Sequence, residues 1–443
     1  MTQNKNAFRI IFVALAAITG SIIFSCTNKK KKDESVSTKV VSKKFANDTF
    51  RVRPLTNFQY ERTAERLKRG EYLTNGLLQC FTCHSPRNWK EPGAPPVADK
   101  IGSGGTILID DSTTLAIAPN ITPDKETGAG KWTDDMLARA IREGVGHDGR
   151  ALFWQMPSST FRYLADEDLA SVIVYLRSIP AVHNVVRPTK MPRELQLGIE
   201  RSLNPITEPV KLPGLSDSIK RGRYLVRLGE CVGCHTSHAE YNPGIFAGGN
   251  YIERFGLKAF SANITSDDSG IPYGPEGFIF VIRTGKGGLL SPIMPWISFK
   301  NMNDEDLKAI YSYLRTFPPA KHSVNSQQPF SRCAICGMDH GLGNKNKREI
   351  PAGIKLNPDL FDQYVGTFLN EEYGDTYMIS KQGNKLTGQQ WENAPKTELI
   401  PQSELHFIGP GWVLGFSFVK DNEGKVTALL EDTDYGRIFK KVK

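Results

Sequence analysis

Apolar side chains recur at helical spacing in two stretches that lie far apart in the chain. The positions are Leu169, Val172, Ile173 and Leu176 in the first stretch, and Leu307, Ile310, Tyr311 and Leu314 in the second. Acidic residues open both stretches and a proline follows each one. Acidic side chains favour helix N-termini, and proline cannot continue a helix. The pattern therefore predicts two helices that begin at Asp166 and Asp304 and stop at Pro180 and Pro318.

Each predicted helix closes a longer segment that occurs twice in the chain. The matching pieces are Gly70-Glu71-Tyr72-Leu73 with Gly222-Arg223-Tyr224-Leu225, Asn120-Ile121-Thr122 with Asn263-Ile264-Thr265, Met156-Pro157 with Met294-Pro295, and Asp166-Glu167-Asp168-Leu169 with Asp304-Glu305-Asp306-Leu307. In both copies the methionine lies ten residues before the first aspartate. The repeat indicates two homologous domains, near 57–184 and 213–322. A first helix is expected from about Ala64 to Leu78, with its counterpart beginning near Ser216, and the last helix of each copy should pack across the first.

The cysteines add a candidate chemistry to this repeat. Six of the seven form Cys-x-x-Cys pairs, and two pairs are followed directly by histidine, in Cys80-Phe81-Thr82-Cys83-His84 and Cys231-Val232-Gly233-Cys234-His235. This is the attachment motif of haem c: two thiols on one helical turn reach the two vinyl groups of a porphyrin, and the imidazole binds the iron. A zinc site would need four ligands, and neither motif has a second pair nearby. A thioredoxin-like redox motif would need a βαβ pattern, which is absent from the sequence around both pairs.

A second iron ligand is predicted from the repeat. Met156 and Met294 occupy equivalent positions, each on a loop, followed by proline and preceding the last helix. A thioether stabilises ferrous iron and raises the potential. A single such methionine could equally fill the core, but the matched pair favours ligands. The remaining histidines are predicted to be solvated or structural: His147, His183, His238, His322 and His406.

The N-terminus has the layout of a secretory signal. Lys5 and Arg9 precede an apolar run that ends in Ser25-Cys26. A small residue before a cysteine resembles a bacterial lipoprotein cleavage site, so Cys26 is predicted to be lipidated. An ordinary signal with a stray cysteine and an uncleaved anchor are the alternatives. The polar stretch that follows indicates a flexible tether.

Composition limits the partners. A chain of 443 residues with 39% hydrophobic and 23% charged residues allows about three globular domains. The formal net charge of +9 includes the basic start of the predicted signal, and haem propionates would lower the charge further. The basic residues are scattered, and no nucleic-acid-binding motif accompanies them, so nucleic acid is not an expected partner.

The C-terminal part has a different pattern. Short runs rich in β-branched and aromatic residues lie at 361–368, 376–380, 385–391, 411–419 and 425–430, separated by turn signals such as Gln382-Gly383-Asn384. They predict a small antiparallel β domain. Before it, Cys333 and Cys336 lack a following histidine. A local disulfide is one interpretation. Together with Met338 and His340 they could instead form a soft site for copper.

The paired motifs resemble the multihaem cytochrome c subunit of bacterial membrane-bound alcohol and gluconate dehydrogenases, over about residues 57–322. The resemblance implies two class I cytochrome c domains, with His84 and Met156 on one iron and His235 and Met294 on the other. It also implies a dehydrogenase as electron donor and a quinone or an oxidase as acceptor. Members of that family usually have a third haem motif, which this sequence lacks. The C-terminal domain weakly resembles the accessory β domain of some β-lactamase-like hydrolases.

Together these observations predict a mainly α protein that carries single electrons and is not an enzyme, held at the periplasmic membrane or the cell surface by a lipid. The predicted organisation is a lipoprotein signal peptide at 1–25, a tether at 26–56, cytochrome domains at 57–184 and 213–322 joined by a linker at 185–212, a linker with the third cysteine pair at 323–356, and a β domain at 357–443. A dihaem peroxidase would need differing ligand sets at its two irons. A metal-handling or sensing module built on Cys333 and Cys336 is the other alternative.

Overall fold

A computed structural model of the chain describes residues 52–91, 93–237, 243–254, 257–287, 293–325, 352–371, 375–389, 396–409, 415–431 and 437–442. The predicted signal peptide, the lipidation site Cys26, the tether as far as residue 51, His238 and the third cysteine pair with Met338 and His340 lie outside these residues. None of the helices in the described ranges has both the length and the apolar character needed to cross a membrane.

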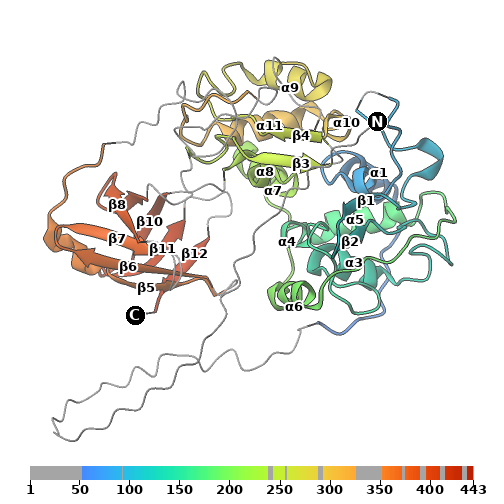
Figure 1. Cartoon of the computed structure of the whole chain (residues 1–443), viewed down its shortest axis with the longest axis horizontal. Helices are drawn as coiled ribbons and strands as arrows, with labels where there is room; N and C mark the ends of the chain where they lie inside the picture. The colour runs from blue at the N-terminus through green and yellow to red at the C-terminus, as the bar shows by residue number, and fades with distance from the viewer. Residues whose placement is uncertain are drawn as a thin grey trace, which may run out of the picture. The chain divides into compact units, whose positions relative to one another are not determined.

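The two repeats contain the same helices and the same β-hairpin in the same order, and the first has an additional 3₁₀ helix (Figure 1). The first repeat consists of α1 (Ala64–Asn75), α2 (Cys80–Cys83), η1 (Ala98–Lys100), β1 (Ile107–Asp110), β2 (Leu115–Ile117), α3 (Asp134–Glu143), α4 (Ser158–Phe161) and α5 (Asp166–Leu176). The second consists of α7 (Ser218–Leu228), α8 (Cys231–His235), β3 (Tyr251–Arg254), β4 (Leu257–Phe260), α9 (Pro275–Thr284), α10 (Trp296–Phe299) and α11 (Asp304–Leu314). The predicted helix starts at Asp166 and Asp304 are confirmed.

The predicted linker between the repeats contains a helix, α6 (Arg193–Ser202). Its Ile199 is buried with Ala116, Ala151 and Phe153 of the first repeat. Residues before α6 also pair with the β1–β2 hairpin, because Lys190 and Leu115 exchange backbone hydrogen bonds of 2.8 Å. This segment therefore packs as part of the first repeat.

The last helix of each repeat packs across the first, as predicted. A glycine lies at each crossing. A Cβ on Gly70 would come within 2.0 Å of the carbonyl oxygen of Ser171, and one on Gly222 within 2.0 Å of the carbonyl oxygen of Ala309. No other residue type fits, because any side chain would overlap the backbone of the partner helix.

The two repeats share one hydrophobic core, and two equivalent hydrogen bonds cross between them. The Tyr224 hydroxyl donates to Asp168 of the first repeat at 2.8 Å. The Tyr72 hydroxyl donates to Asp306 of the second repeat. Each hydroxyl also accepts from the backbone N–H at the N-cap of the last helix it meets, Ala165 or Asn303. Each tyrosine thus binds the start of the last helix in the opposite repeat.

The C-terminal segment forms a closed antiparallel barrel of eight strands (Figure 1). A 3₁₀ helix, η3 (Pro358–Gln363), precedes the strands β5 (Gly366–Leu369), β6 (Thr376–Gln382), β7 (Lys385–Gln389), β8 (Thr397–Pro401), β9 (His406–Ile408), β10 (Gly415–Lys420), β11 (Val426–Glu431) and β12 (Ile438–Lys441). Aromatic side chains fill its interior, among them Phe368, Phe407, Phe416, Phe418 and Phe439.

The prediction of a mainly α protein is wrong. Helices make up 30% of the structure and strands 18%, and the barrel alone has eight strands. The helices of the repeats have only four to twelve residues, and each repeat also contains a β-hairpin. The chain is therefore an α+β protein.

Substitution of Gly222 by alanine tests the helix crossing. Gly222→Ala should destabilise the fold by about 3 kcal/mol, because the new Cβ forces α7 away from α11. Gly198→Ala is the matched control: Gly198 also lies inside a helix, but its Cβ would meet nothing within 4 Å. The control should stabilise by about 0.5–1 kcal/mol. Chemical denaturation of both variants measures the difference, and equal stability would contradict the role of the crossing.

Candidate haem-binding sites

Both cysteine motifs form a short helix that begins after a left-handed residue. Gln79 has a φ of 54° before α2, and Glu230 has a φ of 57° before α8. This turn ends the preceding loop and places both thiols of each pair on one helical turn. The four motif cysteines, all within the described residues, form no disulfide.

The thiols do not have the character of a redox dithiol. Burial, together with a smaller contribution from the neighbouring Cys83, raises the pKa of the Cys80 thiol to about 12. Burial also raises the pKa of Cys234. Thioredoxin-like motifs depend on a lowered pKa instead. Zinc has no support either, because the described ranges contain no group of three or more His, Cys, Asp and Glu placed to hold a metal ion.

The two motif histidines are fixed in the same way. His84 Nδ1 lies 2.9 Å from the carbonyl oxygen of Pro119, and His235 Nδ1 lies 2.8 Å from that of Ala262. A carbonyl oxygen can only accept, so Nδ1 carries the proton in both rings and Nε2 keeps its lone pair. Burial lowers the pKa of both imidazoles, which favours the neutral form that binds iron.

The repeated Asn-Ile-Thr sequence holds the carbonyl groups that orient these histidines. Asn120 directly follows Pro119; its Oδ1 accepts from Thr122 N and Oγ1 at 3.0 and 2.7 Å, and its Nδ2 donates to the carbonyl of Val182 at 2.8 Å. In the second repeat, Asn263 makes the same bonds. Its Oδ1 accepts from Thr265 N and Oγ1 at 2.9 and 2.8 Å, and its Nδ2 donates to the carbonyl of Ala320 at 2.7 Å. The sequence showed this repeat but not its role in orienting the two motif histidines.

Two glycines complete the loop around each histidine. Gly104 N donates to the carbonyl of His84 at 2.8 Å, and Gly248 N donates to that of His235 at 2.7 Å. Both glycines have a positive φ, 72° and 70°. A Cβ on either would lie 2.4 Å from the carbonyl carbon of Pro119 or Ala262, so only glycine allows this approach.

The predicted methionine ligands also have equivalent surroundings. Met156 and Met294 are partly buried and packed against the shared core. The prolines that follow them have nearly identical backbone angles, φ −79° and ψ 56° at Pro157 and φ −78° and ψ 58° at Pro295. A short helix, α4 or α10, begins after each proline. The structure thus preserves the register that the sequence repeat showed.

Four of the other histidines lie within the described residues, and each has a neighbour other than the motifs. His147 stacks on Trp132 with ring centroids 4.4 Å apart, and His183 lies 3.7 Å from Glu126. His322 is buried, and its Nδ1 donates to the carbonyl of Ala247 at 2.7 Å. His406 is in the barrel beside Ser417. These surroundings agree with solvated or structural roles.

The residues present fit a covalently attached haem at both sites. Each repeat supplies two thiols that form no disulfide, an imidazole whose Nδ1 carries the proton, and a methionine that is partly buried against the core. The binding of iron by that methionine stays a prediction. A bound haem would supply a one-electron iron couple, and a methionine as second ligand would raise its potential. The protein's part is to orient the ligands and to exclude water.

Known proteins of similar sequence agree with this chemistry, although no family model matches the chain. The cytochrome c subunit of the quinone-dependent alcohol dehydrogenase of Gluconobacter oxydans is 25% identical over 327 residues, which cover 62% of this chain and 64% of that subunit. The gluconate 2-dehydrogenase cytochrome c subunit of Pantoea cypripedii is 27% identical over 275 residues, covering 56% and 59%. A dihaem c-type cytochrome of Cereibacter sphaeroides is 29% identical over 162 residues, covering 35% and 53%.

The class of protein follows from these similarities: the chain resembles dihaem c-type cytochromes. More particularly, it is similar to the cytochrome c subunits of bacterial dehydrogenases, which confirms the resemblance seen in the sequence. In all three cases the match spans less than two thirds of the relative's length. These relatives imply covalent haem c and are consistent with electron transfer. Copper has no such support, and the resemblance of the barrel to an accessory domain stays a prediction.

The haem content tests both sites. Two haems per chain should survive acid–acetone extraction, because thioether bonds are covalent. Cys80→Ala and Cys231→Ala should each compromise one haem, as measured by the pyridine haemochrome spectrum and by intact mass. Ser202→Ala is a control on α6, away from both motifs. One haem, or three, in the purified wild type would contradict the assignment.

Proposed function

We propose that this protein is an exported dihaem electron carrier that accepts single electrons from a dehydrogenase and delivers them to a respiratory acceptor. The observation that carries the proposal is the equivalence of the two sites, which have the same ligand residues in the same local backbone. A carrier needs irons with both axial positions filled, so that electrons pass and substrates do not bind. A peroxidase needs one iron with a releasable position.

The relatives support the choice of partner. Two of them are named as cytochrome c subunits of dehydrogenases, so a dehydrogenase is the electron donor that we propose for this chain. Single-electron chemistry at His/Met haems suits transfer between proteins, because the ligands do not change on reduction. No substrate is proposed for the donor, because the matches are to cytochrome c subunits and cover 64% and 59% of their length.

Substitution of the two predicted methionine ligands tests whether the protein is an electron carrier or an enzyme. The oxidised wild type should show the weak near-infrared absorption of sulfur-to-iron charge transfer, and Met156→Ala should remove about half of it. The potential of that haem should fall, because a ligand that favours ferrous iron is gone. Met294→Ala should do the same to the other haem. Met136→Ala, on α3 outside the predicted ligand set, is the control.

Binding of carbon monoxide decides the alternative. The wild type should bind it poorly and show little peroxidase turnover, whereas each methionine variant should bind it at one haem. Ready binding by the wild type at one haem would show that this iron is not ligated by histidine and methionine. The enzyme interpretation would then replace the carrier.

We further propose that Cys26 carries a lipid that holds the carrier at the membrane, in the periplasm or at the cell surface. The support is the apolar run that ends at Ser25-Cys26 and the polar stretch that follows. Cys26→Ser should release the protein in soluble form or leave its precursor unprocessed. Incorporation of labelled palmitate and membrane fractionation measure this. A mutant that is labelled and fractionates like the wild type would exclude Cys26 as the lipidation site.

A further inference from the structure

The two cysteine motifs approach each other where the repeats meet. Leu77 lies three residues before Cys80, and Gly229 lies two residues before Cys231. A Cβ on Gly229 would lie 3.3 Å from Leu77 Cδ1 and 3.5 Å from Cys231 Sγ. The segments that lead into the motifs are therefore in contact where the two repeats meet.

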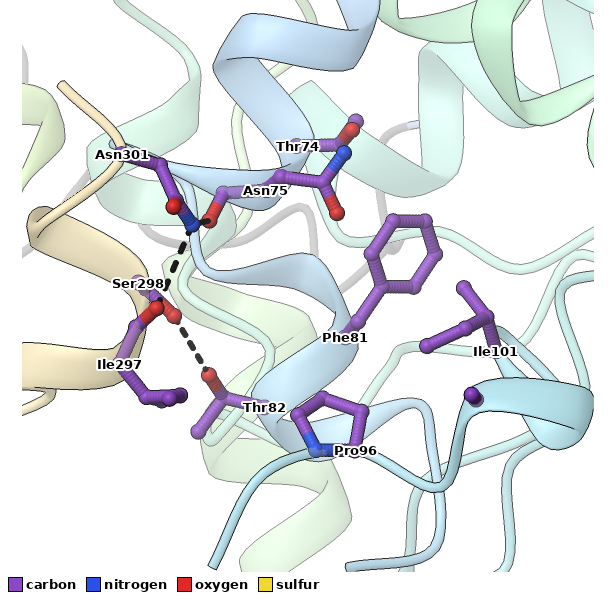
Figure 2. A pocket seen from close by; sticks show the side chains of 10 residues that line it. Thr74, Asn75, Phe81, Thr82, Pro96, Ile101, Ile297, Ser298 and Asn301 are labelled. Atoms are coloured by element: carbon purple, nitrogen blue, oxygen red, sulfur yellow. Dashed lines mark hydrogen bonds between the residues drawn. The ribbon is translucent and has the colours of Figure 1, made fainter. Parts of the chain in front are cut away.

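Hydrogen bonds connect each motif to the opposite repeat. Thr82, between the first two cysteines, lies with its Oγ1 3.1 Å from Ser298 Oγ of α10, and Figure 2 shows the two side chains pointing toward one another. A second bond joins the repeats in the opposite sense: Thr160 of α4, in the first repeat, donates to Glu230 Oε1 of the second repeat at 3.3 Å. Both α4 and α10 directly follow a predicted methionine ligand. Thus the first motif, and the residue that directly precedes the second motif, are each hydrogen-bonded to the short helix that follows the opposite repeat's predicted methionine ligand.

A pocket of about 270 Å³ lies beside the first of these bonds (Figure 2). Its lining combines Phe81 and Ile101 of the first repeat with Ile297 and Asn301 of the second. Asn301 Nδ2 donates to the carbonyls of Asn75 and Ile297 at 3.1 and 3.3 Å. Its amide is thus used to hold the repeats together.

The charges at this interface are not symmetric. Arg254, at the end of β3 in the second repeat, reaches across and donates from Nη2 to Cys83 Sγ at 3.2 Å. The equivalent position in the first hairpin holds an aspartate, Asp110, which is exposed. Arg87 of the first repeat is close as well: burial lowers the pKa of its guanidinium, and the charge of Arg254 lowers it further. Two cations therefore lie near the first motif.

The second motif has an acidic neighbour instead. Glu230 directly precedes Cys231, whereas the equivalent residue of the first motif is the neutral Gln79. Burial raises the pKa of Glu230, while the hydrogen bond from Thr160 and the charge of Arg254 lower it. Arg254 touches the first motif directly and acts on Glu230 and Cys234 through space.

We propose that Arg254 and Glu230 set the order of the two reduction potentials, with the first site above the second, so that electrons pass from the second repeat to the first. Reduction adds one negative charge to a haem, which a neighbouring cation stabilises and a neighbouring carboxylate destabilises. One electron leaves the second site and enters the first, and no atoms are transferred. This inference rests on the proposed function, because it needs two sites ligated by histidine and methionine.

Arg254→Gln tests the cation. Spectroelectrochemical titration of the dihaem protein at pH 8 should resolve two midpoints, and the variant should lower the upper one by about 59 mV, a tenfold change in the ratio of reduced to oxidised first haem. Arg254→Lys keeps the positive charge, so its upper midpoint should lie close to that of the wild type. A merely structural role of Arg254 would not predict this difference between the two variants. Lys258→Gln removes a charge of the same sign from the same hairpin, where the side chain is exposed, and should leave both midpoints unchanged.

Glu230→Gln tests the carboxylate. It preserves an acceptor for Thr160 and should raise the lower midpoint. Met156→Ala removes a ligand from the first site only, so the spectral component that it changes identifies the first haem. An unchanged midpoint in either charge variant, or assignment of the first haem to the lower midpoint, would overturn the inference. Failure of the proposed function would be seen separately, as a wild type that lacks two six-coordinate haems with histidine and methionine ligands.

Discussion

The close crossing of the first and last helix in each repeat is the constraint on which the cytochrome part of this structure depends. Gly70 and Gly222 bring the backbones together at a distance that no side chain would permit. The crossing fixes the position of α1 and α7, and therefore the position of the short helices α2 and α8 that follow them and carry the thiols. It also fixes the segment after the last helix, whose carbonyl groups at Val182 and Ala320 hold the Asn-Ile-Thr loops. The orientation of each motif histidine thus follows from a contact between two helices.

The same crossing exposes the starts of the last helices to the opposite repeat. Asp168 and Asp306 are buried there, and burial of a carboxylate costs free energy unless it is paired. Each is paired twice. Arg69 binds Asp168 with two bonds of 2.8 Å, Arg221 binds Asp306, and a tyrosine from the opposite repeat donates to each. Removing one partner would leave a buried charge unsatisfied, so these bonds favour one arrangement of the repeats.

That arrangement has a consequence for electron transfer. Duplicated domains with equal ligands would have similar potentials if their surroundings were equal. The interface makes them unequal, because it places Arg254 of one repeat on the cysteine of the other and leaves Glu230 beside its own motif. A difference between two otherwise equivalent sites thus arises from the contact between the repeats, which neither repeat contains alone.

The sequence by itself determined the local features of this protein. Spacing within five residues identified both haem motifs, apolar periodicity located the last helices, and the internal repeat paired Met156 with Met294. In the C-terminal segment, runs rich in β-branched and aromatic residues, bounded by turn signals, predicted the strands at 376–380 and 385–391. It did not predict β8, β9 and β12, which are short and have few apolar positions. They become strands because closure of the barrel supplies hydrogen-bonding partners on both sides.

Only the tertiary structure decided the features that depend on distant residues. The carbonyls of Pro119 and Ala262, the tyrosine–aspartate pairs and the contact of Arg254 with Cys83 join residues that are far apart in the chain. No periodicity encodes such pairs, because side-chain spacing reports only on neighbours within one element. The overall class was mispredicted for a related reason. Helical motifs dominate the sequence signal of the repeats, whereas the strands gain their stability from pairing with one another across the barrel.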